Sequence, residues 1–341
     1  MKVRSSIAKV VGAALALGGA ASVVWAAPQA ASGSEWYAPV AQAAAAGALK
    51  PLVLKGQQPA SAPDRVGTPT MFLMKGVQLM HGHAKAPISI KSDPKLAYYG
   101  GPMLGNVKVQ VVYWNKDVAY QDRLPGFYST ITGSPYFDWL KEYDAGKSAV
   151  GEGSYAGSYA DSVPAASGSQ IKDADIRAEL GKLIEKGKVT QPDPNTLYMV
   201  YFPPGLNIDL DGNGSCQVFC AYHNTFLHGG QEVNYGVLPD QGGQCSGGCG
   251  SDADQFNNET SVSSHELIEA VTDPAVGLVQ GNTPQAPLGW YDTSYGEIGD
   301  ICNAAQAKVA GYVVQREWSN RRNLCVASDS DPGSPFVPPG W

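Results

Sequence analysis

The sequence lacks the features by which several common classes of protein are recognised. It has no Lys/Arg stripe, with 24 basic against 31 acidic residues, so we expect no nucleic-acid partner. It also has no P-loop, no G-x-S-x-G segment and no dinucleotide-binding fingerprint. The sequence therefore nominates neither a nucleotide site nor a serine nucleophile.

Long apolar runs are missing after the first 26 residues. Within those 26, three basic residues precede an apolar stretch from Val10 to Val24, and the small residue Ala26 follows. The stretch is shorter than the roughly 20 residues that a spanning helix needs. The pattern predicts a signal peptide over residues 1–26 and no membrane anchor, so we expect a secreted protein, extracellular or periplasmic. Cleavage would leave 21 basic residues against 31 acidic ones, a formal charge of −10 that favours solubility.

All six cysteines lie in the last part of the chain. An even number of cysteines in an exported protein predicts disulfides, although six cysteines allow 15 pairings and their order along the chain does not choose among them. Two C-x₃-C pairs could instead supply zinc thiolates, but an oxidising compartment favours bridges. The expected disulfide cysteines are Cys216, Cys220, Cys245, Cys249, Cys302 and Cys325.

Composition divides the chain into four parts. Residues 1–26 are the expected signal peptide, and residues 27–95, rich in Ala, Pro, Gly and Ser, read as a low-complexity leader or a propeptide. Residues 96–327 are long enough for one globular domain with a sizeable core. Residues 328–341 read as an extended tail. His81 and His83 fall in the leader, where we expect them to be exposed.

Hydrophobic periodicity within residues 96–327 predicts alternating strands and helices. The expected fold class is α/β or α+β, a single disulfide-stabilised domain with helices packed on a mixed β-sheet, and a zincin-like form of it is suggested by analogy alone. The predicted elements are a strand at Val107–Trp114, a helical region at Tyr120–Tyr143, a helix at Asp173–Lys186, strands at Asn195–Phe202 and Val233–Leu238, a helix carrying His265, and a strand or hairpin at Lys308–Trp318.

The segment SSHELIEAVTDP carries the sharpest chemical pattern. His265 and Glu269 stand four residues apart on a helix that Pro274 must end, so they project from one face and can share a metal ion. In H-E-x-x-H metalloproteases the Glu after the first His activates a metal-bound water. Here Glu266 has that place and Glu269 replaces the second His, which still predicts a zinc site because imidazole and carboxylate both bind zinc. The alternative is a surface ion pair.

A third metal ligand would come from elsewhere in the chain. Asp300 and Glu297 are the main candidates, because residues 289–300 are dense in carboxylates, and His223 is a further one. Asp273 is disfavoured, since eight residues along a helix is about 12 Å along its axis from His265.

A second cluster of oxygen side chains suggests calcium. Asp209, Asp211 and Asn213 alternate as in the first half of a calcium-binding loop. Position 12 of that loop would be Cys220 instead of Glu, so the alternative is an Asx-rich turn.

Several separated blocks along the chain have a recognisable order and spacing. They are Tyr98–Pro102 with Val107–Trp114, Tyr201–Gly205, Cys216-x₃-Cys220-x₂-His223, Gln244-Cys245-x₃-Cys249, Thr272-Asp273-Pro274, and finally Trp290-Tyr291, Glu297–Asp300, Cys302 and Cys325. These blocks resemble, in family order, the EXORDIUM, or phosphate-induced protein, family of secreted and cell-wall proteins. The resemblance covers about Tyr98 to Cys325 and implies association with the cell wall, but it supplies no reaction. Many plant members lack the pair that stands here as His265-Glu266.

Together these patterns favour a secreted metal-dependent hydrolase, most plausibly a zinc metallopeptidase-like enzyme. His265, Glu269 and either Asp300 or Glu297 would hold zinc, and Glu266 would take a proton from the zinc-bound water. The alternative is a non-catalytic binding protein of the EXORDIUM type. In either case the expected partner is an extracellular protein or a cell-wall polymer.

Overall fold

A computed structural model describes residues 93–336, apart from 147, 163, 165–167, 247, 251, 277, 281–282 and 286–287. The expected signal peptide and nearly all of the leader, including His81 and His83, lie outside the described residues, as does the end of the tail from 337 to 341.

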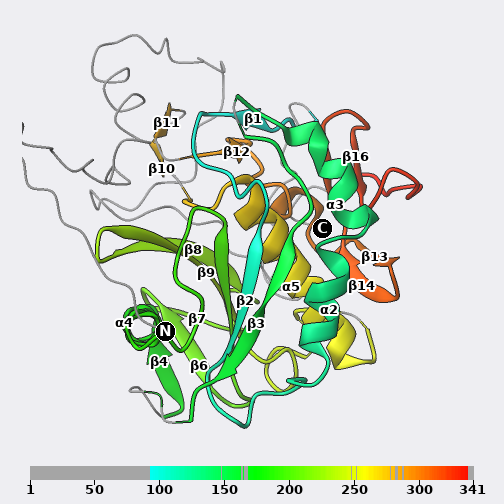
Figure 1. Ribbon diagram of the computed structural model, residues 1–341. Coiled ribbons are helices and arrows are strands. Elements are labelled where there is room, and N and C mark those ends of the chain that lie inside the picture. The colour runs from blue at the N-terminus through cyan, green and yellow to red at the C-terminus, as the bar shows by residue number, and fades with distance from the viewer. Residues whose placement is uncertain are drawn as a thin grey trace, which may run out of the picture. The chain divides into compact units, whose positions relative to one another are not determined.

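A five-stranded sheet of order β3-β2-β5-β9-β8 organises the described residues (Figure 1). The first four strands in that order are parallel, and β8 pairs antiparallel with β9 at the edge. Every residue of β5 is buried, as a central parallel strand covered on both faces requires. The strands predicted at 107–114, 195–202 and 233–238 are confirmed. Their bounds and those of their neighbours are β2 Lys108–Tyr113, β3 Ser154–Ala160, β5 Thr196–Tyr201, β8 Tyr222–His228 and β9 Gln231–Leu238.

Helices cover both faces of this sheet. The predicted helix at 173–186 is α4, Asp173–Glu185, and the predicted helix carrying His265 is α5, Gln255–Thr272. On one face the Tyr235 hydroxyl donates to Asp173 of α4 over 2.6 Å. On the other face the Tyr201 hydroxyl lies 2.7 Å from the Ser263 hydroxyl of α5. Because side chains alternate along a strand, the register of each strand decides which residues meet α5.

The predicted helical region at 120–143 is helical and consists of three short pieces. Gly133-Ser134-Pro135 interrupts it, and the Ser134 side chain accepts a hydrogen bond from the Tyr136 N–H at the start of the second piece. A proline in the first turn with a serine before it begins a new helix. The pieces are α2 Leu124–Ile131, α3 Pro135–Asp138 and the 3₁₀ helix η3 Trp139–Tyr143.

The remaining strands form small two- and three-stranded sheets around this body. The segment predicted as a last strand or hairpin is a hairpin, β13–β14, followed by β15. Residues after Ala327 fold back on β16, where Ser334 pairs with Cys325. The bounds are β1 Ala97–Tyr98, β4 Gln170–Lys172, β6 Asn207–Leu210, β7 Asn213–Gly214, β10 Leu278–Gln280, β11 Thr283–Gln285, β12 Trp290–Tyr291, η4 (3₁₀) Asp300–Cys302, β13 Gln306–Val309, β14 Tyr312–Gln315, β15 Glu317–Ser319 and β16 Leu324–Val326.

The six cysteines form three disulfides, Cys216–Cys245, Cys220–Cys249 and Cys302–Cys325. Disulfides are thus confirmed, and their pairing, which the sequence left open, is fixed by the fold. Three bridges are typical of a protein in an oxidising environment. Within the described ranges, no helix is long and apolar enough to cross a membrane.

The segment with the proposed calcium ligands is a tight turn between β6 and β7. Asp211 has φ +51° and Gly212 has φ +87°. The Asp209 side chain accepts a hydrogen bond from the Gly212 N–H over 2.6 Å, and the Asn213 amide donates to the Leu210 carbonyl over 3.1 Å. These hydrogen bonds are typical of an Asx-rich turn, which was the alternative to a calcium site. The described groups of side chains that could hold a metal do not include Asp209 or Asp211.

Glu259, in the first half of α5, is expected to make the stability of the protein depend on pH. Its side chain is buried, and burial raises the pKa of its carboxyl group well above the usual value, although a hydrogen bond from the Gln241 N–H acts to lower that pKa. A raised carboxyl pKa means that the folded state binds more protons, so stability falls as pH rises from the unfolded pKa of about 4.3 toward the folded pKa. We expect Glu259→Gln to flatten this fall, by at most about 1.4 kcal/mol per pH unit. Urea unfolding of both proteins at pH 5 and pH 8 measures it, and equal slopes would contradict it.

Candidate metal centre

Helix α5 places His265, Glu266 and Glu269 inside the protein. The helix is buried on all sides, because the sheet covers one side and β14 covers another, where the Gln315 N–H donates to the Ser264 hydroxyl over 2.9 Å. His265 and Glu269 lie one turn apart as predicted, with His265 Nε2 3.1 Å from Glu269 Oε1. Since all three side chains are at most 1 % exposed, the alternative of a surface ion pair is excluded.

Strand β8 brings His223 to the same place. His223 pairs with Gly236 of β9 and points to the face of the sheet that α5 covers. Its Nδ1 lies 3.2 Å from Glu266 Oε2 and 3.6 Å from Glu269 Oε2, and its Nε2 lies 3.1 Å from the Asp273 backbone carbonyl. Thus side chains of a strand and a helix, 43 residues apart in sequence for His223 and Glu266, form one cluster.

The loop before η4 and the first residue of η4 supply two further carboxylates, those of Glu297 and Asp300. The Asp300 N–H donates to Glu269 Oε1 over 3.0 Å, and the Glu297 N–H donates to Asp300 Oδ2 over 3.1 Å. Gly296 allows this close fold, because a Cβ at that position would collide with the Asp300 carboxylate. The Cys302–Cys325 bridge ties the end of the loop to β16. Both candidates for the third ligand are therefore held at the helix.

Two groups of side chains in this cluster have ligand atoms within 4.8 Å of one another. One is His265, Glu269 and Asp300, and the other is His223, Glu269 and Glu297. The structure thus separates the predicted ligands into two sets that share Glu269. Asp273 belongs to neither set, as predicted, although its carboxylate is buried nearby and accepts a hydrogen bond from the Gly289 N–H.

Several buried polar atoms of the cluster have no hydrogen-bond partner among the described residues. Buried groups in native proteins are nearly always satisfied, so each such atom requires an explanation. Every ion pair that the cluster's carboxylates form goes to His223 or His265, and neither Lys nor Arg takes part. A divalent cation would satisfy these atoms. They are His265 Nε2, Glu266 Oε1, Glu269 Oε2, Asp273 Oδ2, Glu297 Oε1 and Glu297 Oε2.

The electrostatics of the cluster show how costly these carboxylates are without a cation. Burial raises the pKa of Glu269 to about 7 and that of Asp300 to about 8, and it raises the pKa of Glu297 well above its usual value. Burial by itself would lower the pKa of His223, but the Glu297 carboxylate and the neighbouring Glu266 raise it well above 6.5. The cluster therefore attracts positive charge, either protons or a metal ion.

Gln315 of β14 orients the His265 ring. Its Nε2 donates to the Gly299 carbonyl over 2.9 Å and lies 2.7 Å from His265 Nδ1. An ion on His265 Nε2 requires the ring proton on Nδ1, and rotation of the Gln315 amide by about 180° would offer its oxygen to that proton. Sequence reasoning missed this residue. The signal available in the sequence was a glutamine at the end of the otherwise apolar run YVVQ. The structure shows that this glutamine is fully buried.

Gly299 leaves the space that His265 and Glu269 occupy. A Cβ at Gly299 would lie 2.6 Å from His265 Nδ1 and 2.9 Å from Glu269 Oε1, distances at which something must move. We expect Gly299→Ala to displace both side chains and to weaken metal binding by about tenfold or more. Calorimetric titration with zinc measures the loss. The matched control is Gly133→Ala, where a Cβ meets nothing within 4 Å, and equal affinities of the two variants would contradict the assignment.

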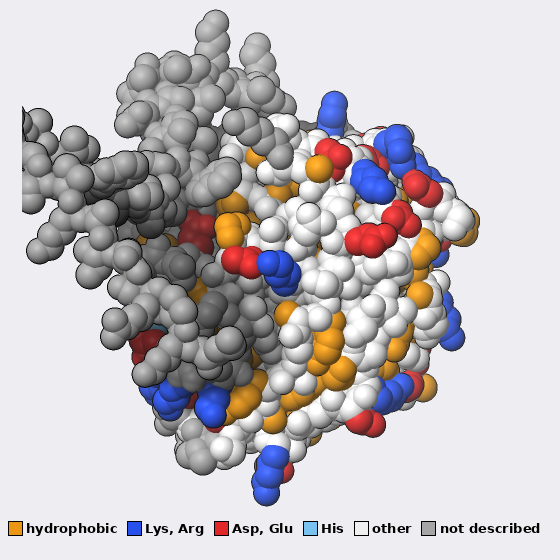
Figure 2. All heavy atoms as spheres, viewed as in Figure 1, with side chains coloured by type: hydrophobic (Ala, Val, Ile, Leu, Met, Phe, Trp, Pro, Cys, Tyr) orange, Lys and Arg blue, Asp and Glu red, His pale blue; other side chains and the backbone are white. Residues whose placement is uncertain are grey.

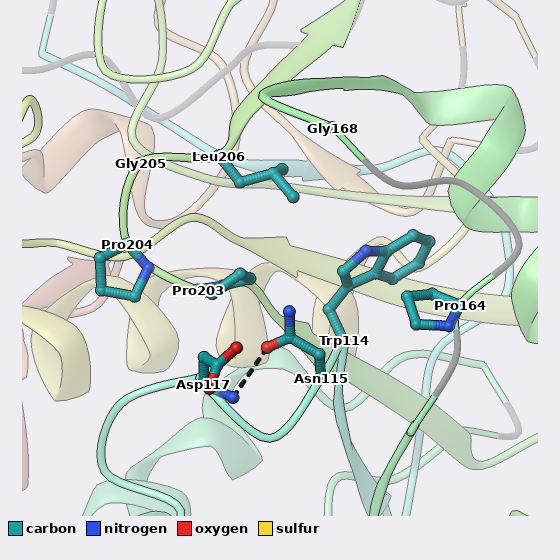
Figure 3. Close-up of a pocket in the computed structure, with 9 residues that line it drawn as sticks. All are labelled: Trp114, Asn115, Asp117, Pro164, Gly168, Pro203, Pro204, Gly205 and Leu206. Atoms are coloured by element: carbon teal, nitrogen blue, oxygen red, sulfur yellow. Dashed lines mark hydrogen bonds between the residues drawn. The ribbon is translucent and has the colours of Figure 1, made fainter.

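A cavity of about 460 Å³ lies at the carboxyl ends of β2 and β5 (Figure 3). The chain leaves β2 toward β3 on one side and later enters β5 on the other, so this is the point where open α/β sheets bind ligands. Among the described residues that line it, Asp117 is the titratable one, and none of them belongs to the metal cluster. It is lined by Trp114, Asn115, Asp117, Pro164, Gly168, Pro203, Pro204, Gly205 and Leu206.

Comparisons with known proteins identify no relative. No family model, no curated protein and no solved structure matches the chain. The EXORDIUM resemblance therefore stays a prediction, and the function must be argued from the site.

On the face seen in Figure 2, acidic and basic side chains of the described residues are interspersed.

Proposed function

We propose that this chain is a secreted, zinc-dependent hydrolase of the peptidase type, with a zincin-like arrangement of its helix motif. The observation that carries the proposal is the buried group His265, Glu269 and Asp300, in which His265 Nε2 faces carboxylate oxygens without a hydrogen-bond partner. Imidazole and carboxylate groups both bind zinc, and three protein ligands would leave a fourth position for water or substrate, as catalytic sites do.

When bound there, zinc would acidify a water molecule and polarise the carbonyl of the scissile bond. The chain's own base would be Glu266. Its Oε1 lies 4.0 Å from His265 Nε2, beside the proposed ligands, and has no hydrogen-bond partner among the described residues. Burial raises the pKa of Glu266, against a hydrogen bond from His223, and a carboxylate with a raised pKa is a stronger base near neutral pH. Glu266 would take the proton of the attacking water and pass it to the leaving amine.

Asp300 marks the side from which a substrate would enter. His265, Glu266 and Glu269 are almost fully buried, whereas Asp300 keeps partial exposure as a residue, although its carboxyl group is surrounded by protein. The place of action would be outside the cytoplasm, which the signal-peptide pattern and the three disulfides support.

The test is the metal content of the full chain, purified without a histidine tag. We expect about one zinc ion or more per chain by elemental mass spectrometry and loss of zinc in His265→Ala. His228→Ala, on the same strand as His223 but partly exposed, is the matched control and should keep the metal. Cleavage of a peptide library by the zinc-loaded protein would complete the case. A folded parent that binds no zinc would refute it.

The second candidate is a non-catalytic extracellular binding protein, and burial of the cluster favours it. Structural zinc sites are closed, whereas catalytic ones keep an open position. In that case the chain would hold zinc without cleaving any peptide and would bind cell-wall polymer, and His265→Ala would lose stability instead of an activity. Failure to bind any wall fraction would count against this candidate.

A further inference from the structure

The two oxygens of Glu269 face two different histidines. Oε1 lies 3.1 Å from His265 Nε2, and Oε2 lies 3.6 Å from His223 Nδ1. The first histidine comes from the same helix and the second from β8. A carboxylate that presents one oxygen to each of two nitrogen ligands has the arrangement of a bridging ligand.

His223 is placed as a ligand and not only as a neighbour. Its Nε2 can donate to the Asp273 backbone carbonyl over 3.1 Å, which leaves a lone pair on Nδ1. That lone pair faces Glu266 Oε2 at 3.2 Å and Glu269 Oε2 at 3.6 Å. Because ionised carboxylates only accept hydrogen bonds, either a proton on Nδ1 or a metal ion must lie between these atoms.

Glu297 completes a second group. Its side chain is 1 % exposed, and neither of its oxygens has a hydrogen-bond partner among the described residues. It lies close to His223, with Oε1 3.5 Å from Nε2, and its ligand atom is within 4.8 Å of those of His223 and Glu269. Two unpartnered oxygens on a fully buried carboxylate need a cation or two donors.

The cluster holds enough carboxylates for two ions. They are those of Glu266, Glu269, Asp273, Glu297 and Asp300, and among the described residues their ion pairs go to histidines, not to Lys or Arg. Two divalent ions would bring four positive charges to these five carboxylates. Each ion would have its own histidine and its own second carboxylate, with Glu269 shared.

We propose that this chain binds a second divalent transition-metal ion through His223, Glu269 and Glu297, and that Glu269 bridges it to the first ion. The inference rests on the proposed function for the first ion. One nitrogen and several carboxylate oxygens suit zinc or manganese. Two ions in such sites lie about 3.5–4 Å apart and together stabilise the attacking and the leaving oxygen of a displacement reaction. The substrate class would then extend from peptides to other hydrolysable acyl or phosphoryl groups.

The experiment uses the full chain, stripped of metal and titrated with Mn²⁺. We expect two equivalents to bind, and electron paramagnetic resonance to show an exchange-coupled pair instead of the six-line signal of isolated Mn²⁺. Glu297→Gln, which keeps the shape of the side chain, should bind one equivalent with an uncoupled signal. His228→Ala is the matched control and should keep the coupled pair. The parent's spectrum tests the proposal even if the variant does not fold.

The outcomes separate the two proposals. One equivalent in the parent, unchanged by Glu297→Gln, would overturn the second site and leave the proposed function intact. A coupled pair in a protein that cleaves no peptide would support the second site and refute the peptidase. No bound metal in a folded parent would overturn both.

Discussion

Glu266→Gln is expected to reduce kcat/KM for peptide cleavage by about 10²–10⁴-fold while the metal content stays that of the parent. The amide has the shape of the carboxylate but cannot accept a proton from water. Glu266 belongs to neither group of proposed ligands, and its Oε1 has no hydrogen-bond partner, so the substitution should leave the ligands in place. Peptide hydrolysis and elemental analysis of the same sample measure both quantities.

Glu259→Gln is the matched control for this experiment. It changes a buried carboxyl of the same helix, two turns earlier, whose neighbour is Gln241 and which lies in neither metal group. The control should cleave as fast as the parent. If Glu266→Gln also does so, Glu266 is not the base and the mechanism proposed here is wrong.

Removal of the metal is expected to lower the melting temperature by about 5–10 °C. A ligand present at 100 times its Kd stabilises the native state by about 2.7 kcal/mol, and a domain of this size shifts by about 2–4 °C per kcal/mol. The physical reason is that stripping the ion leaves desolvated carboxylates facing one another, as the raised pKa values of Glu269 and Asp300 indicate. Thermal melting with excess zinc and with chelator at pH 7.5 measures the difference.

Glu269→Gln should abolish this zinc dependence, because Glu269 belongs to both groups of proposed ligands. Its melting curve should be the same with zinc and with chelator. His228→Ala should retain the full shift. A parent whose melting temperature does not respond to zinc would show that the cluster is satisfied by protons alone.

Features that depend on residues close together in the sequence were predicted correctly, because the geometry of a helix is local. The i, i+4 spacing of His265 and Glu269 and the stop at Pro274 fixed a helix with both side chains on one face, and the structure confirms it. Alternation and apolar runs likewise indicated the central strands. The region at 120–143 was predicted to be helical without internal bounds, and the structure divides it at Ser134-Pro135, where the capping serine starts a new piece.

The parts of the site that depend on distant segments were left open. Sequence spacing offered Glu297, Asp300 and His223 as alternatives for one ligand position, whereas the fold holds all three in two groups around Glu269. Gln315 and Gly299 were not nominated, since one acts through the orientation of a ring and the other through the absence of a Cβ.

The sequence by itself determined the even number of cysteines, the periodicity of the helices and strands and the one-turn spacing of His265 and Glu269, because these can be read along the chain. Only the tertiary structure decided the three disulfide pairings, the burial of α5 and the meeting of β8 with the loop before η4. Those depend on which strands pair and in which register, and a shift of one residue would turn His223 to the opposite face of the sheet.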